Sequence, residues 1–502
     1  MKKIKFLKER TEMQPCAIGL QGKCCKNCLM GPCRFIHPED KGVCGADIDV
    51  ITSKNILRFV AGGASAHIGH AYEILKFFKR KYPLGYIEKK APPYLIKLWK
   101  KLEIMPKIYF EHFKDISQAL HMSTMGTCAD FTKLLGWAMK LGIEDGYYGV
   151  YLATELEDKE FGKPKIQKGK INLGVIEKDK VNIAVHGHVP LFAEILASEC
   201  KKKGNSDINL VGVCCTGASI LARHGIPLAA NFILQEDVIA TGMIDVMVVD
   251  TQCIMPSLAD LCECFHTNLI TTNPFCRFPN VLHMPLKTKK HCVAVAKKII
   301  KIARQNKKAR KKISEIKKET KEVMIGFSQY NLPLDEWARK IKNKEKRGII
   351  AVIGCVNPRV SDDWINAYKK LSKDYIILAT GCIAFELGIR GLLDGKRFFH
   401  LGSCVNNARV AEVFRIIAKK LGKKITKLPF FASCPAPITE KSIAIGFFFA
   451  SIGIDVHFGY PFLLSSDSKI AYWFENLLKK DFESRIFLET NPKKLLEEIY
   501  TK

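Results

Sequence analysis

The chain has 502 residues, with 79 Lys and Arg against 50 Asp and Glu, so its formal net charge is +29, and it contains 19 cysteines. Its 47% hydrophobic content excludes a wholly disordered protein, and its length predicts roughly two to four domains. The basic start, Met1–Arg10, has no apolar stretch behind it and is not typical of a secretory signal. So many cysteines in an intracellular chain indicate metal or redox chemistry rather than structural disulfides.

Six cysteines gather near the start of the chain: Cys16, Cys24, Cys25, Cys28, Cys33 and Cys44. The last four, named here the relay set, have ferredoxin-like spacing and can hold one [4Fe–4S] cluster, although the same thiolates would also serve zinc. Cys16 and Cys24 cannot close a cuboidal cluster alone. A twofold axis beside them would add two thiolates from a second copy, so the ligand count predicts a homodimer with a bridging cluster.

Helical patterns follow the cysteines, at Ile51–Lys81 and Phe131–Leu141, with a Pro- and Lys-rich stretch at 83–106 between them. In the first of these helices the small residues AGGASA allow another backbone to approach closely. Titratable residues then recur every three positions, on one side of the helix: His67, His70, Glu73 and Lys76. Such a row can pass protons, or it can be an ordinary polar helix face.

From residue 169, short β-branched runs alternate with helix-like segments, as in a parallel sheet with crossover helices. The runs lie at 181–185, 208–213, 246–250, 348–353, 375–379 and 398–401. We therefore predict an α/β fold with three domains. A helical N-terminal domain (1–168) precedes two Rossmann-like parallel-sheet domains (169–347 and 348–502).

A lysine-rich segment separates the two sets of runs. Lys287–Glu322 holds 15 Lys and Arg against three acidic residues, with apolar residues at helical spacing. This pattern predicts a long surface helix with one buried stripe and a solvated lysine face. A basic face can also bind nucleic acid or an acidic protein, but no zinc-finger, helix-turn-helix or RNA-binding motif accompanies it, so we expect no nucleic-acid partner.

A potential metal ligand follows each predicted strand. These strand-end ligands are His188, Cys215, Cys253, Cys355, Cys382 and Cys404. One such cysteine can be a small buried hydrophobe, but six indicate a shared site, because open α/β sheets bind ligands beyond the carboxyl ends of their strands. Two facing sheets would gather all six, and thiolates with an imidazole suit nickel, iron or an iron–sulfur centre. His186 and Cys214 are adjacent candidates that the spacing does not separate from His188 and Cys215.

The most apolar window, Ile443–Ile454, predicts a buried element, because a membrane-spanning helix needs about 20 apolar residues. We expect a soluble, cytoplasmic protein with no transmembrane segment.

Several motifs between Cys16 and about Gly446 are typical of one protein family. They are GLQGKCCKNCLMGPCR, VAGGASAHIGH, NIAVHGHVP, VGVCCTG, DTQCIMPSLADLCEC, LGSCVNNAR and EKSIAIG. Together they resemble the catalytic subunit of the anaerobic nickel–iron–sulfur carbon monoxide dehydrogenases. The resemblance implies the prismane/hybrid-cluster-like architecture. It also implies reversible oxidation of CO with water to CO2, two protons and two electrons.

By this resemblance, the relay set would bind a [4Fe–4S] cluster, and Cys16 with Cys24 would supply half of a [4Fe–4S] cluster bridging two subunits. The strand-end ligands would hold a nickel–iron–sulfur cluster of the Ni–4Fe–4S type. The choice of His188 and Cys215 within their pairs rests on the family pattern. Lys441 and His67 match the family's acid/base residues. Electrons would leave to a ferredoxin-like carrier, for which a basic surface is suited.

The chain also departs from the family pattern. It is shorter than typical members, and Glu73 and Lys76 stand where the proton path usually has further histidines. The main alternative is a hybrid-cluster protein that reduces hydroxylamine or nitric oxide. That family uses glutamate ligands and one N-terminal four-cysteine set, so the six N-terminal cysteines here favour carbon monoxide dehydrogenase. A third hypothesis is a non-enzymatic iron–sulfur protein that binds nucleic acid.

Overall fold

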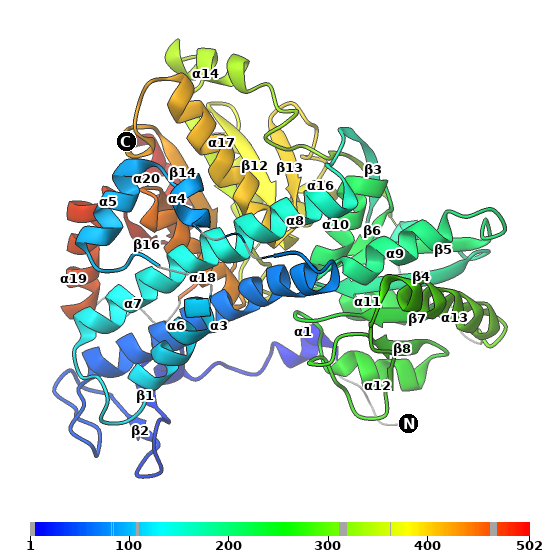
Figure 1. The fold of residues 1–502 in the computed structure, drawn as a ribbon, viewed down its shortest axis with the longest axis horizontal. Helices are drawn as coiled ribbons and strands as arrows, with labels where there is room; N and C mark the ends of the chain where they lie inside the picture. Colours follow the sequence, from blue (N-terminus) through cyan, green and yellow to red (C-terminus); the bar gives the residue numbers. More distant parts are fainter. Residues whose placement is uncertain are drawn as a thin grey trace.

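The chain folds into a helical N-terminal region and two α/β units built on separate sheets (Figure 1). The computed structural model describes residues 6–81, 83, 85–106, 110–310, 319–361, 363–461 and 469–501. The predicted α/β class with a helical start is confirmed.

The first sheet has the strand order β10-β3-β6-β5-β4-β7-β8-β9 and is parallel except for the β10–β3 pair. Its bounds are β3 (Gln167–Ile171), β4 (Val181–Gly187), β5 (Ile208–Val213), β6 (Leu228–Ala230), β7 (Ile244–Val249), β8 (Asn268–Thr271), β9 (Leu282–His283) and β10 (Lys321–Ile325). The three runs predicted in this half are confirmed as β4, β5 and β7. Every residue of β4 and β7 is buried, which is why these strands are apolar runs rather than alternating ones.

The second sheet is parallel throughout, in the order β13-β12-β11-β14-β15-β16. Its bounds are β11 (Gly348–Val352), β12 (Tyr375–Thr380), β13 (Phe398–Gly402), β14 (Phe430–Cys434), β15 (Asp455–Phe458) and β16 (Ile486–Leu488). The predicted runs are confirmed as β11, β12 and β13. The last three strands were not predicted.

Helices cover both sheets. Around the first sheet they are α9 (Leu191–Cys200), α10 (Cys214–His224), α11 (Gln235–Ala240), α12 (Ser257–Cys264) and α13 (Lys289–Lys307). Around the second they are α14 (Leu334–Lys342), α15 (Asp363–Leu371), α16 (Cys382–Ile389), α17 (Asn407–Lys420), α18 (Glu440–Ser451), α19 (Lys469–Leu477) and α20 (Pro492–Thr501).

The lysine-rich helix is shorter than predicted. The structure confirms α13 with a buried stripe that includes Ile299 and Ile300. However, the prediction that the helix reaches Glu322 is wrong, because Lys321–Ile325 forms the edge strand β10. In that strand Val323 and Ile325 are buried while the lysine and glutamate before them are exposed, so packing against β3 outweighs the basic composition. Residues 311–318, on which part of the prediction falls, lie outside the described residues.

The N-terminal region is organised by two long helices that lie side by side (Figure 1). One is α3 (Ile48–Phe77), whose 30 residues span about 45 Å. Its first turn is capped by the Asp47 carboxylate, which accepts a hydrogen bond from Val50 N at 2.9 Å. The other runs through α7 (Phe131–Glu144), the π-helical segment η1 (Asp145–Tyr151) and α8 (Leu152–Phe161). The remaining helices here are α1 (Leu7–Arg10), α2 (Ala17–Leu20), α4 (Tyr86–Lys90), α5 (Pro93–Lys101) and α6 (Phe110–Met122).

The small residues of α3 permit close contact with α18 and η1. A Cβ on Gly63 would lie 2.4 Å from the Glu440 carbonyl oxygen, and a Cβ on Gly149 would lie 2.6 Å from the Cβ of His67. The close backbone approach predicted for AGGASA is therefore confirmed, and its partner is α18. This helix contains most of the apolar window at 443–454, which is buried as predicted.

One continuous core joins the helical region to the second sheet, since residues of α3, α7, α18, β11 and β14 belong to the same buried cluster. The strands of the first sheet lie between residues 167 and 325 and those of the second between 348 and 488. The domain boundaries at 168/169 and 347/348 stay a prediction. Among the described residues, no helix is both long and apolar enough to cross a bilayer.

The contact at Gly63 leads to a stability prediction. Gly63→Ala should lower the free energy of unfolding by about 1–3 kcal/mol or more, because the new methyl group overlaps the backbone of α18. Gly69→Ala, in the same helix with nothing within 4 Å of the added Cβ, should be neutral or stabilising by up to about 1 kcal/mol. Thermal unfolding of both variants measures the difference, and equal midpoints would contradict it.

Candidate metal centre

The carboxyl ends of the two sheets converge on one buried cavity. All six strand-end ligands line it, together with Cys214, Phe232 and Lys441. Of the described residues that line this cavity, none is an aspartate or a glutamate. The structure therefore brings together the residues that the sequence placed after six separate strands, as expected for ligands beyond the carboxyl ends of parallel strands.

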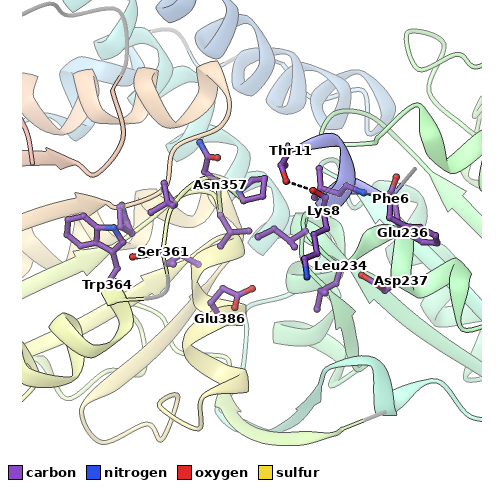
Figure 2. A pocket seen from close by; sticks show the side chains of 18 of the residues that line it. Phe6, Lys8, Thr11, Leu234, Glu236, Asp237, Asn357, Ser361, Trp364 and Glu386 are labelled. Atoms are coloured by element: carbon purple, nitrogen blue, oxygen red, sulfur yellow. Dashed lines mark hydrogen bonds between the residues drawn. The ribbon is translucent and has the colours of Figure 1, made fainter. Parts of the chain in front are cut away.

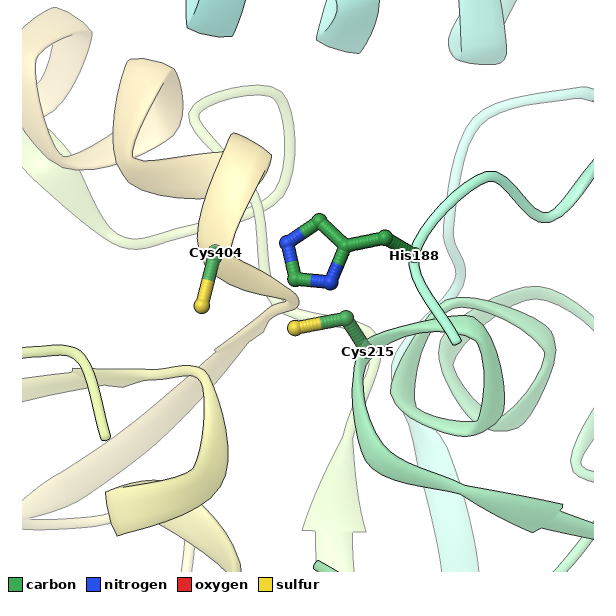
Figure 3. Close-up of side chains that lie close together, drawn as sticks. All are labelled: His188, Cys215 and Cys404. Carbon is green, nitrogen blue, oxygen red and sulfur yellow. The ribbon is translucent and has the colours of Figure 1, made fainter. Parts of the chain in front are cut away.

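Three of these residues are close enough to hold one metal ion (Figure 3). Ligand atoms of His188, Cys215 and Cys404 all lie within 4.8 Å of one another, and all three residues are buried. His188 directly follows β4 and Cys215 lies in the first turn of α10, after β5, whereas Cys404 begins the short helix η3 (Cys404–Asn406) after β13 of the second sheet. The site is thus assembled across the interface between the two sheets.

The geometry also separates His188 from the adjacent candidate ligand His186. His186 lies within β4, where its Nε2 is 3.0 Å from Gln235 Oε1, and it is absent from the cavity lining. His188 lines the cavity. Both Cys214 and Cys215 line it too: Cys214 contacts Cys382, and Cys215 contacts His188 and Cys404, so the cavity does not separate this pair.

Lys441 brings a buried charge into the cavity from the first turn of α18. Only 4% of the residue is exposed. Its Nζ lies 3.0 Å from His188 Nε2, 3.0 Å from Gln252 Oε1 and 3.5 Å from Cys253 Sγ. Burial alone would lower the pKa of Lys441, but the negative charge that the surrounding cysteines carry when they are ionised, Cys253 and Cys215 first, outweighs burial and raises the pKa, so the side chain is a cation.

The pKa of His188 is lowered, in contrast to that of Lys441. Burial lowers the pKa of its imidazole to about 4, and the Lys441 cation contributes to the decrease, although the Cys215 thiolate opposes it. At neutral pH His188 is therefore uncharged, which is the form of imidazole that binds a metal.

Asp250, directly after β7, holds His188 and the residue that follows Cys215 in place. Its carboxylate accepts hydrogen bonds from His188 N at 2.6 Å and from Thr216 Oγ1 at 2.6 Å. Burial raises the pKa of Asp250 to about 6. This residue was not predicted from the sequence. The signal available in the sequence was its position, since it is an acidic residue at the end of a predicted strand, just before Cys253.

His67 lies beside the cavity and is held by a second buried acid. His67 Nδ1 is 2.7 Å from Asp145 Oδ1, and both side chains are fully buried. The His67 ring centroid is 6.2 Å from that of His188, and His67 Nε2 has no hydrogen-bond partner among the described residues. Asp145 was also missed, because it lies 78 residues away in η1 and no motif marks it.

The titratable row of α3 runs from this buried site to the surface. His70 Nε2 lies 3.0 Å from the buried Glu157 Oε1, Glu73 accepts a hydrogen bond from Asn273 Nδ2 at 2.6 Å, and Lys76 is exposed. Burial raises the pKa of Glu73. The predicted row is thus one face of α3 with graded burial.

The relay set forms a second site near the start of α3. All four of its cysteines line a cavity of about 210 Å³, together with Cys128, a fifth cysteine that the sequence analysis did not single out. Cys16 and Cys24 lie outside this lining. Cys16 is exposed, and its Sγ accepts a hydrogen bond from Gly19 N at 3.4 Å.

A larger cavity of about 580 Å³ is lined by α1 and by segments of both α/β units (Figure 2). Val356 and Ile383 line it, and these residues directly follow Cys355 and Cys382. Helix α1 is held over it by an ion pair of 2.7 Å between Arg10 and Glu236. Nothing in the sequence predicted this cavity, since its walls come from helices and loops of both α/β units and from the N-terminal segment.

The chain matches a known protein family along most of its length. The model of the Prismane/CO dehydrogenase family matches residues 23–84 and 75–493. The chain belongs to this family.

The matches to individual family members cover most of this chain and most of each relative. Carbon monoxide dehydrogenase 1 from Methanosarcina acetivorans is 33% identical, over 92% of this chain and 87% of that protein. Among solved structures, carbon monoxide dehydrogenase IV from Carboxydothermus hydrogenoformans has a TM-score of 0.91 and 31% identity, covering 99% of this chain and 95% of that one. The as-isolated, Ni-free carbon monoxide dehydrogenase from Thermococcus sp. AM4, produced without the CooC maturase, has a TM-score of 0.90 and 30% identity, covering 99% and 93%. The resemblance seen in the sequence is confirmed.

The hydrogen bonds of Asp250 predict that this side chain stabilises the fold. Asp250→Ala should lower the free energy of unfolding by about 2–4 kcal/mol, because the His188 amide and the Thr216 hydroxyl lose their buried acceptor. Asp250→Asn keeps one acceptor oxygen and should recover most of the loss. Asp335→Ala, which removes a carboxylate that is 91% exposed, should change stability by no more than about 0.5 kcal/mol. Denaturant unfolding ranks the three, and equal effects of Asp250→Ala and Asp335→Ala would contradict the assignment.

Proposed function

We propose that the protein oxidises CO with water to CO2, two protons and two electrons, reversibly, at a nickel–iron–sulfur cluster held by the strand-end ligands. The observation that supports this most directly is the buried cavity in which these five thiols and one imidazole face a lysine cation. The relatives named carbon monoxide dehydrogenase support the same reaction.

The donor set fits such a cluster. Burial raises the pKa of the Cys253 thiol to about 12, so ligation would have to displace its proton, as expected where soft metals bind buried thiolates. Six donors exceed the four that a tetrahedral zinc ion needs. When bound, the cluster would supply redox-active, Lewis-acidic metals for joining CO to water.

In this reaction Lys441 has an electrostatic role. Its Nζ, already a cation in the cavity, stabilises the negative charge that develops on the oxygens of the substrate as CO is converted to CO2. Gln252 holds the ammonium in position by accepting a hydrogen bond at 3.0 Å.

His67 acts as the acid/base residue. With Nδ1–H donated to Asp145, the tautomer leaves Nε2 free to accept a proton from water. His70 and Glu73, one and two turns further along α3, then lead the proton toward the surface. Asp145 is a positioning residue, because it acts through the His67 ring.

Electrons would leave through the relay set, which would hold a [4Fe–4S] cluster at the start of α3. Cys16 and Cys24 would provide half of a cluster shared with a second copy, so the working form is a homodimer. The acceptor would be a small acidic carrier of the ferredoxin type, which suits a chain of net charge +29.

Reduction of hydroxylamine or nitric oxide at a hybrid cluster is the second candidate. The absence of any carboxylate from the described lining argues against a glutamate-ligated cluster. The relatives described above are carbon monoxide dehydrogenases, which also favours CO.

Anaerobic purification with metal analysis and CO-dependent reduction of a viologen dye tests the proposal. We expect about one nickel per chain and CO-dependent dye reduction. Lys441→Ala should lower kcat by about 10²–10³-fold, because one preorganised electrostatic contact is lost, while nickel and iron contents stay at the wild-type level. Lys427→Ala, at a lysine that is 65% exposed, is the matched control and should leave kcat unchanged. Iron without nickel, together with hydroxylamine reduction, would refute the proposal.

The bridging cluster gives a separate prediction. The double variant Cys16→Ser/Cys24→Ser should contain about two fewer irons per chain, which is half of one shared [4Fe–4S] cluster. Nickel content should not change, because the strand-end ligands are intact. Iron analysis together with the oligomeric state from light scattering measures this. Unchanged iron in a stable dimer would contradict the bridging role, without affecting the proposal for the nickel site.

A further inference from the structure

We propose that a basic cavity at the end of α17 binds a small anion carrying several phosphate groups. The cavity has a volume of about 380 Å³ and lies between the α4–α5 connection and the last turn of α17. Its charged lining residues are all cations: Lys89, Lys90, Arg415, Lys419, Lys423 and Lys424. None of these residues belongs to the sequence motifs described above, and none has a role in the proposed oxidation of CO.

Most of this charge is not neutralised by the protein. Two of the cations have carboxylate partners, since Lys90 pairs with Glu155 and Arg415 pairs with Glu412 at 2.5 Å. The other four form no ion pair within the described part of the chain. The carboxylate of Glu483 also acts on Lys424 at longer range, but it is bonded to Lys427 at 2.6 Å.

Four unneutralised cations around one concave space repel one another. Their side chains are exposed, so solvent screens part of this repulsion, but the concave shape concentrates their field and attracts a counter-charge. The repulsion would be relieved by a ligand with several negative charges, and lysine ammonium and arginine guanidinium groups are the usual donors to phosphate oxygens.

The shape of the site favours a small ligand over a macromolecule. Its volume falls within the range of about 300–1,000 Å³ that is usual for small-molecule sites. The Tyr94 ring and two prolines close one side, and Lys424 Nζ lies 5.4 Å from the Tyr94 ring centroid. A duplex or a folded acidic protein would meet the rim of this cavity but could not fill it, whereas inorganic tripolyphosphate or the phosphates of a nucleotide could.

The site is remote from the redox chemistry. Cys404 lies in η3, just before α17, and the basic residues lie at the opposite end of this 14-residue helix, about 20 Å away. Binding of the anion therefore does not depend on the cluster or on turnover, and failure of this proposal would leave the proposed oxidation of CO unaffected.

Isothermal titration calorimetry with tripolyphosphate, on the full-length protein at fixed ionic strength, tests the site. We expect saturable binding that the double variant Lys419→Ala/Lys423→Ala weakens by about tenfold or more, since two charge-assisted contacts are lost. The control is Lys297→Ala/Lys298→Ala, which removes the same charge from the exposed face of α13 and should change affinity by less than about twofold. Lys89→Ala/Lys424→Ala is a second variant in the cavity, drawn from different elements, in case the first does not fold.

Three results would overturn the proposal. One is equal weakening by the cavity and α13 variants, which would show only the general charge of the chain. Another is a sulfate affinity equal to that of tripolyphosphate, which would mean that several linked phosphates are not recognised. The third is binding of duplex DNA or polyglutamate without competition from tripolyphosphate, which would assign the patch to a macromolecule.

Discussion

The burial of the Lys441 ammonium among cysteine thiols is the interaction on which the rest of the structure depends. A buried cation costs several kcal/mol unless nearby groups compensate for it. Here His188 and Gln252 accept its hydrogen bonds, and the cysteines of both α/β units supply negative charge when they are ionised. No single sheet supplies this environment. The two α/β units and α18 must therefore be placed accurately relative to one another.

Helix α3 connects the parts of the molecule that redox chemistry would need to couple. Its first turns line the cavity of the relay set through Val50, Ile51 and Lys54, and its middle places His67 beside the metal cavity. The contact at Gly63, one turn before His67, sets the distance from α3 to α18 and so the position of Lys441 relative to His67. A proton path and an electron path would therefore share one rigid element.

Much of the fold could be read from the sequence where burial was complete. The runs that became β4, β5, β7, β11 and β12 are central strands, and β13 is an edge strand that is also fully buried, so all six appear as continuous apolar runs. The edge strand β10 has mixed composition and β16 has only three residues, so the structure of each depends on a neighbouring strand. This is why the lysine-rich helix was extended into β10. The candidate site was predicted in large part because its ligands follow the central strands directly.

The sequence by itself determined the donor chemistry: which thiols and imidazoles are present, their positions after strands, and the resemblance to carbon monoxide dehydrogenases. Only the tertiary structure decided which groups meet. It separated His188 from His186, placed Asp145 on His67 and Asp250 on His188, and left the cations at the end of α17 without carboxylate partners. The physical reason is that covalent order fixes which side chains follow a strand, whereas hydrogen bonds and charge compensation between segments 60 to 250 residues apart depend on how the sheets and helices pack.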